Sequence, residues 1–276
     1  MYLDKEIISS RNNSFVKWAS SLADKKNRKN ERYFIAEGVK LTQEALAAGL
    51  PVDFCIVNEK KKDAVLESIS EFLEDEKFAA CKIVTVTDNV FEKISTEKSP
   101  QGVISVIKYL DFFREMDIIY KEEFFLQPDE KAIFLHSVRD PSNLGAVIRS
   151  SVAFGTDHVI LTDDCADIYN SKTIRSAMGS LYRVKVTIVG NTESFIAAAH
   201  ANSRRVFAAE LTDNAISLAD AGLTSTDIVV IGNEGHGIPE EISVLCDGSV
   251  YIPISKKTES LNASVAAAIF MWEQNK

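Results

Sequence analysis

Three polar segments in the C-terminal half of the chain carry side chains that could bind and orient a ligand. Each segment follows an apolar stretch typical of a buried strand, and in open parallel sheets ligands bind at the carboxyl ends of the strands. Glycines within the segments would let backbone N–H and C=O groups approach such a ligand closely. The polar residues are Asn143 and Arg149 in residues 139–155, Glu234 in residues 228–242, and Ser260 and Asn262 in residues 250–274.

Each of these features also has an ordinary structural explanation. Arg149 could pair with a carboxylate across the sheet, because long basic side chains usually pair or extend into solvent. The three glycines of residues 232–237 could simply form a tight turn. Ser260 or Asn262 could cap the helix that follows, although capping does not easily account for both. The order G-x-x-G-x-G also differs from the dinucleotide fingerprint, which argues against a nicotinamide cofactor.

The elements that must position these residues form an α/β fold. From residue 132 to 276, short apolar strands alternate with helices, and this alternation predicts a parallel sheet covered on both faces. The helix expected over residues 263–272 is apolar on every side, so we expect it to be buried all round or to lie in a subunit interface.

A chain of 276 residues is long enough for a second domain. We expect residues 1–108 to form a small α/β domain, and its strands are predicted from β-branched stretches such as residues 82–87. Helical periodicity over residues 14–50 predicts two helices that flank a basic turn. Residues 109–131 mix aromatic with acidic side chains and are predicted to connect the domains.

The charge is unevenly distributed along the chain. A net charge of −9 argues against a protein that coats nucleic acid through a general positive field. Residues 11–40 nevertheless contain eight basic and three acidic residues, so a local patch could contact phosphates. The candidates for this contact are Arg11, Lys17, Lys25, Lys26, Arg28, Lys29 and Arg32.

Several classes of protein are disfavoured by what the sequence lacks. The four cysteines and four histidines are dispersed, without the spacing of a zinc site, so we expect no metal. The first residues lack an apolar stretch of signal-peptide length, and no later window approaches a membrane span. We therefore expect a cytoplasmic protein with no membrane partner.

The three segments together resemble the motifs of a known family. DPSNLGAVIRSSVAFG, then IGNEGHGIP, then YIPISKKTESLNASVAAAI are similar to the three successive motifs of the SpoU (TrmH-type) RNA 2'-O-ribose methyltransferases, and SKTIRSAMGSLYRVKV resembles the family's middle region. The resemblance covers residues 132–276 firmly. Residues 1–108 resemble, more loosely, the family's RNA substrate-binding domain, which is similar to a ribosomal-protein fold.

The resemblance implies a fold, a cofactor and a set of partners. The fold would be an α/β knot, in which the C-terminal segment threads through a preceding loop as a deep trefoil knot. Partners would be RNA and a second copy of the chain, in a homodimer with the site near the interface. S-adenosylmethionine would lie in the knotted loops against Gly232, Ile252 and Leu261.

The resemblance also implies roles for the polar residues. Asn143, Arg149, Glu234, Ser260 and Asn262 match the positions that the family uses around the reacting ribose and the methyl donor. The matching arginine is proposed in the family to be the base, yet a guanidinium is almost never deprotonated in proteins. Arg149 could instead clamp an RNA phosphate and stabilise the developing alkoxide. Glu234 is better suited to orient Arg149 or a neighbouring polar group than to act as the base.

Some alternatives stay open. The chain departs from the family pattern at His136, where an acid is common, and in its acidic connector. Base methylation is disfavoured, because knotted base methyltransferases lack this combination of motifs. A non-catalytic RNA-binding or ribosome-binding protein is disfavoured because all five polar residues are present. The N-terminal domain favours ribosomal RNA over transfer RNA by family analogy alone.

Overall fold

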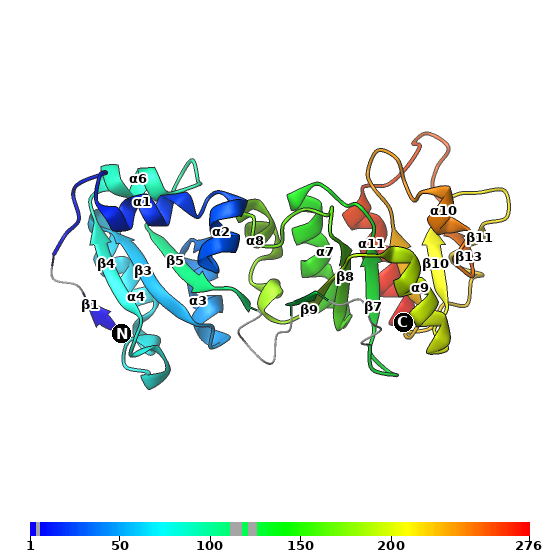
Figure 1. The fold of residues 1–276 in the computed structure, drawn as a ribbon, viewed down its shortest axis with the longest axis horizontal. Coiled ribbons are helices and arrows are strands. Elements are labelled where there is room, and N and C mark those ends of the chain that lie inside the picture. Colours follow the sequence, from blue (N-terminus) through cyan, green and yellow to red (C-terminus); the bar gives the residue numbers. More distant parts are fainter. Residues whose placement is uncertain (4–5, 111–117, 121–125) are drawn as a thin grey trace. The chain divides into compact units, whose positions relative to one another are not determined.

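The computed structural model describes residues 1–3, 6–110, 118–120 and 126–276. These residues form two compact units (Figure 1). The first consists of the described part of Met1–Arg114 together with Tyr169–Tyr182, and the second of the described part of Glu115–Ile168 together with Arg183–Lys276. None of the described helices is long and apolar enough to cross a membrane.

The first unit is built around a five-stranded sheet of order β1-β4-β3-β5-β2. β3 and β4 are parallel, whereas β5 runs antiparallel to both of its neighbours. The strands are β1 (Tyr2–Leu3), β2 (Tyr33–Glu37), β3 (Val52–Asn58), β4 (Lys82–Val86) and β5 (Val103–Lys108). The helices are α1 (Ser14–Ser21), α2 (Lys25–Glu31), α3 (Val39–Ala47), α4 (Lys62–Ser68), α5 (Ser70–Leu73) and α6 (Asp88–Ile94). α1 packs against α6 over a core that includes Val16, Ile56 and Phe91.

The strand predicted at residues 82–87 is confirmed as β4, but the prediction for residues 14–50 is partly wrong. The basic stretch is itself the helix α2, capped by the Asp24 carboxylate, and not a turn. Tyr33–Glu37 forms the strand β2, which pairs with β5. Long-range pairing of Phe34 with Ile107 decides this structure, and local periodicity does not report such pairing.

The second unit contains an eight-stranded sheet of order β11-β13-β10-β12-β7-β8-β9-β6, and every strand pair in it is parallel. This confirms the parallel sheet that the sequence predicts. The strands are β6 (Ile118–Tyr120), β7 (Ala132–Leu135), β8 (His158–Thr162), β9 (Lys185–Val189), β10 (Val206–Ala209), β11 (Ile216–Ser217), β12 (Ile228–Ile231) and β13 (Gly248–Tyr251). The helices are α7 (Pro141–Phe154), α9 (Thr192–Ala201), α10 (Glu240–Ser243) and α11 (Ala263–Gln274).

Two features differ from the predicted domain arrangement. Within the predicted connector, Ile118–Tyr120 forms β6 and pairs with β9, while residues 111–117 and 121–125 lie outside the described residues. The segment Tyr169–Tyr182, which includes α8 (Ser171–Ala177), groups with the first unit, although the predicted domain boundary placed it in the second.

Aromatic contacts explain why this segment belongs to the first unit. The Tyr169 ring stacks on Tyr109 at 4.0 Å and on Phe34 at 4.8 Å between ring centroids. Its hydroxyl accepts a hydrogen bond from the Leu110 N–H at 2.8 Å. Burial of aromatic rings of this size contributes strongly to packing. The segment is therefore part of the core of the first unit.

Candidate active site

The central strands β7 and β12 bring the first two polar segments together. Leu135, the last residue of β7, is paired with Ile231, the last residue of β12, so the loops that follow them leave the sheet side by side. Asn143 in α7 donates a hydrogen bond from Nδ2 to Oε1 of Glu234 at 2.8 Å. The backbone N–H groups of residues 139 and 140 also point at this carboxylate, at 3.4 Å. Asn143 and Glu234, which come from two different segments, are therefore in direct contact.

Asn262 joins the third segment to this pair. Its Nδ2 donates to Oδ1 of Asn143 at 2.9 Å. Its Oδ1 accepts from the Ser264 N–H at 2.9 Å and so caps α11. The capping explanation is thus correct for Asn262, and the same side chain also closes a chain of hydrogen bonds from Asn262 through Asn143 to Glu234. We call these three residues the polar triad.

Arg149 and Ser260 take no part in the hydrogen bonds of the polar triad. Arg149 follows Asn143 by six positions in α7, which corresponds to about 9 Å along the axis and about 120° around it. Arg149 is exposed, and among the described residues it has no ion pair, so the carboxylate partner considered above is not found. Ser260 is also exposed, and within the described part of the chain its hydroxyl makes no hydrogen bond.

The surroundings of Glu234 keep it ionised. Burial acts to raise its pKa, but hydrogen bonds from Asn143 and from nearby backbone N–H groups outweigh this effect and hold the pKa below its ordinary value. A carboxylate with a lowered pKa is a weaker base and a good acceptor. The geometry therefore agrees with an orienting role for Glu234, directed at Asn143 and not at Arg149.

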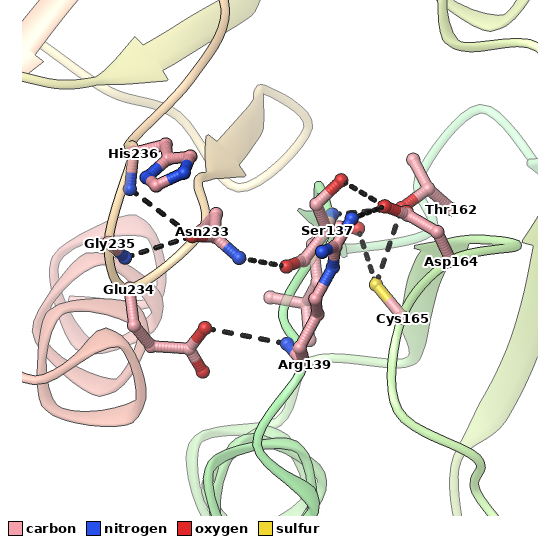
Figure 2. A network of polar contacts seen from close by, with 10 residues as sticks. Ser137, Arg139, Thr162, Asp164, Cys165, Asn233, Glu234, Gly235 and His236 are labelled. Atoms are coloured by element: carbon pink, nitrogen blue, oxygen red, sulfur yellow. Dashed lines mark hydrogen bonds and ion pairs between the residues drawn. The ribbon is translucent and has the colours of Figure 1, made fainter.

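A second polar network supports the loop after β7, and sequence reasoning missed it (Figure 2). The Ser137 hydroxyl donates to Oδ2 of Asp164 at 2.6 Å, and Arg139 forms an ion pair with the same oxygen at 3.0 Å. Burial acts to raise the pKa of Asp164, but hydrogen bonds from Ser137, Thr162 and Arg139 lower it to about 2. Asn233 reaches the same loop by donating to the Ser137 carbonyl. In the sequence, the one sign that Asn233 belongs to the site is its position between Gly232 and Glu234.

The predicted cofactor residues lie in the loops after β12 and β13. A Cβ atom on Gly232 would lie 2.4 Å from the backbone carbon of Gly237, so this position requires glycine because its own loop folds closely over it. Gly237 itself has a φ of +69° and open space where a Cβ would project. Ile252 and Leu261 are half-buried at the two ends of an exposed loop. Both loops therefore leave backbone groups accessible beside apolar side chains.

The basic residues of the first unit do not form one uniform patch. Arg11, Lys17, Lys25, Lys26 and Lys29 are exposed. Arg28 is only 3% exposed and donates to the backbone carbonyls of residues 22 and 23, so its prediction as an RNA contact is wrong. Arg32 is half-buried, with its guanidinium 4.7 Å from the centre of the Tyr109 ring.

Arg28 therefore satisfies two backbone carbonyls in the turn that follows α1. Trp18 is half-buried against Phe15, Tyr33 and Phe54, and its indole N–H donates to Glu31. Within the described ranges, no three His, Cys, Asp or Glu side chains are grouped so that they could hold a metal ion.

Comparison with known proteins places this geometry among RNA methyltransferases. Residues 130–272 match the model of the SpoU rRNA Methylase family, and residues 13–105 match that of the MRM3-like substrate binding domain. The chain is 28% identical over 269 residues to the 23S rRNA (guanosine(2553)-2'-O)-methyltransferase of Bacillus subtilis, covering 97% of this chain and 98% of that protein. It is 26% identical to the 23S rRNA (uridine(2479)-2'-O)-methyltransferase of Streptomyces viridochromogenes, covering 96% and 90%.

A solved structure agrees with these relatives. The crystal structure of an AdoMet-bound rRNA methyltransferase from Sinorhizobium meliloti superposes with a TM-score of 0.79 at 27% identity. The alignment covers 98% of this chain and 97% of that one, so the similarity extends over both units.

Proposed function

We propose that this chain, which belongs to the SpoU rRNA Methylase family, is an enzyme that transfers a methyl group from S-adenosylmethionine to a ribose 2'-hydroxyl of ribosomal RNA. The observation that carries the proposal is the polar triad, in which one residue from each of the three family motifs is joined by hydrogen bonds at the carboxyl edge of the sheet. A protein that had lost the reaction would have no need to keep these three side chains in one network.

Ribosomal RNA is favoured because two relatives that align along nearly the whole chain are named as 23S rRNA 2'-O-methyltransferases. The match of residues 13–105 to a substrate binding domain supports RNA binding by the first unit. The likeness of this unit to a ribosomal-protein fold stays a prediction. A transfer RNA substrate is the alternative.

The loops after β12 and β13 fit S-adenosylmethionine. Gly235 and Gly237 leave the backbone of the first loop open, while Ile252 and Leu261 offer apolar contacts for a purine ring at the ends of the second. Exposed backbone groups could hold the adenosine through hydrogen bonds. When bound, the cofactor supplies a methyl group carried on a sulfonium.

The side chains around this position would orient the ribose and stabilise charge. Glu234, ionised and bonded to Asn143, fixes the carboxamide of Asn143, which in turn fixes that of Asn262. These groups and the Ser260 hydroxyl would hold the ribose for in-line attack. We assign Arg149 to an RNA phosphate or to the developing alkoxide, because it is an exposed cation without an ion pair among the described residues.

Two further proposals concern the architecture. The C-terminal segment would thread through a preceding loop as a deep trefoil knot, as the family membership implies. The chain would form a homodimer through α7 and α11, because α11 exposes Val265 by 46% and Trp272 by 57% on one face. The Trp272 ring contacts Phe154 of α7. Exposed apolar patches of this kind mark interaction sites. We also propose a cytoplasmic location, where ribosomal RNA would be available as a substrate.

The proposed function is tested by transfer of tritiated methyl from S-adenosylmethionine to total ribosomal and transfer RNA. The products are digested with nuclease to see whether the label is on the ribose. Arg149→Ala is the test variant, and Lys98→Ala removes an exposed cation of the first unit as a control. We expect label on a 2'-O-methylnucleotide of ribosomal RNA with the wild type and Lys98→Ala, and none with Arg149→Ala.

Other outcomes would contradict the proposal in distinguishable ways. Label on transfer RNA alone would favour the alternative substrate. Label on a base would refute ribose methylation. No incorporation into any RNA, together with no cofactor binding, would indicate a non-catalytic RNA-binding protein.

A further inference from the structure

The loop after β7 contains a residue in a conformation that glycine usually adopts. Ser137 has a φ of +56°. Such a backbone conformation costs about 1–3 kcal/mol and persists where its surroundings fix it. Three groups fix it here: Thr162 Oγ1 accepts from the Ser137 N–H at 2.9 Å, Asp164 accepts from its hydroxyl, and Asn233 Nδ2 donates to its carbonyl at 2.7 Å. The turn at Ser137 directs the N–H groups of residues 139 and 140 toward Glu234.

Asn233 uses both ends of its carboxamide, and each end serves a different loop (Figure 2). Nδ2 binds the loop after β7, as described. Oδ1 accepts from the N–H groups of Gly235 at 2.9 Å and His236 at 3.2 Å, within the loop that carries Glu234. The Asn233 backbone also exchanges two hydrogen bonds of 3.0 Å with Gly237. One side chain therefore braces the β12 loop internally and ties it to the β7 loop.

We propose that Asn233 is a positioning residue for methyl transfer, which holds the β7 and β12 loops in the register that lets Glu234 and Asn143 meet. The proposal rests on the proposed function. Only an amide satisfies both loops, because the position needs a donor toward Ser137 and an acceptor toward Gly235 and His236. An aspartate of the same shape would keep the acceptor and place a second oxygen against the Ser137 carbonyl.

The test compares Asn233→Asp and Asn233→Ala with Asn191→Asp. Asn233→Asp replaces the donor with a charged acceptor, and Asn233→Ala removes both contacts without adding charge. Asn191 is an exposed helix cap of the second unit, whose carboxamide oxygen accepts from Ser194 N–H, and aspartate caps equally well, so this control adds the same charge elsewhere. The measurements are kcat and KM for RNA methylation, and amide hydrogen exchange of residues 232–238 in the protein without cofactor or RNA.

We expect kcat to fall at least about tenfold in both Asn233 variants, with KM for RNA changed less than about threefold, because positioning acts on the reacting geometry. Hydrogen exchange of residues 232–238 should become at least about tenfold faster in Asn233→Ala, and Asn191→Asp should match the wild type throughout. Three results would each overturn the proposal: a smaller fall in kcat, a loss of activity that comes from a raised KM for RNA, or unchanged hydrogen exchange of residues 232–238 in Asn233→Ala.

If one Asn233 variant fails to fold, the kcat and KM of the other variant test the proposal. Wild-type protein that methylates no RNA would instead overturn the proposed function, and the exchange measurement would still test whether Asn233 braces the loops.

Discussion

Replacing Gly232 with alanine tests whether the two arms of the β12 loop must lie in close contact. The new Cβ would lie 2.4 Å from the carbon, and 2.6 Å from the oxygen, of the Gly237 carbonyl, and 2.7 Å from the Ile238 nitrogen. All three are backbone atoms, so no side chain can rotate away to relieve the contact. Ordinary contacts between carbon atoms begin near 3.5 Å, so the Gly237–Ile238 backbone would have to move by about 1 Å.

That movement sets the magnitude of the effect. It would break the paired hydrogen bonds between Asn233 and Gly237, each of which contributes about 1 kcal/mol. The strain of accommodating a methyl group adds to this loss. We therefore expect Gly232→Ala to lower the free energy of unfolding of the second unit by about 1–3 kcal/mol. Affinity for S-adenosylmethionine should fall about tenfold or more, because the loop that would hold the cofactor is displaced.

Urea denaturation and isothermal calorimetry with S-adenosylmethionine measure the two effects. Gly190→Ala is the matched control, because a Cβ there would meet no atom within 4 Å. It should leave cofactor affinity unchanged and stability equal or up to about 1 kcal/mol higher, since alanine restricts the unfolded chain. Gly232→Ala protein with wild-type stability and wild-type cofactor affinity would refute the reasoning.

Two other predictions concern the first unit and the sheet of the second. Arg28→Ala should destabilise the protein by about 1–3 kcal/mol in urea denaturation, because it leaves one buried and one partly buried backbone carbonyl unpaired. Lys29→Ala should leave stability unchanged and reduce the salt dependence of RNA binding. A loss of stability in Lys29→Ala, or a reduced salt dependence in Arg28→Ala, would contradict the structural role of Arg28 and the RNA-binding role of Lys29. Burial acts to raise the pKa of Glu130, but hydrogen bonds from His158 and Lys185 lower it to about 2 from an ordinary 4.5. Its carboxylate therefore stabilises the fold above about pH 4.5, and this contribution is lost as the pH falls toward 2. Glu130→Gln should lower the free energy of unfolding by about 1–3 kcal/mol at pH 7. It should also weaken the dependence of the melting temperature on pH between pH 4.5 and 2. A melting curve with the wild-type pH dependence would exclude this stabilising role of the Glu130 carboxylate.

How far the sequence predicts the fold depends on where the stabilising contacts come from. β7 and β12 are central strands, buried on both faces, and their unbroken apolar residues predict them directly. Tyr33–Glu37 is a strand because of its partner β5, which lies about 70 residues away. Arg28 looks like a surface cation, because nothing local shows that it reaches back to the end of α1.

The candidate site divides in the same way. Asn143, Glu234 and Asn262 are predicted because their motifs can be recognised, and the structure shows that they touch. Asp164 and Asn233 were not predicted as site residues, because their contacts with Ser137 span 27 and 96 positions of sequence. The separation of Arg149 from Asn143, in contrast, follows from helical geometry alone.

The membership of Tyr169–Tyr182 in the first unit has a consequence for the order of synthesis. Tyr109 packs against the ring of Tyr169, and Leu110 donates a hydrogen bond to its hydroxyl. Both residues leave the ribosome long before Tyr169 does. Translation at roughly 5–20 residues per second delays the end of this segment by about 4–14 s. During that interval the nascent N-terminal unit lacks part of its core. Its completion is timed by translation of the methyltransferase region, so a ribosome that stalled before residue 169 would hold an unfinished substrate-binding unit.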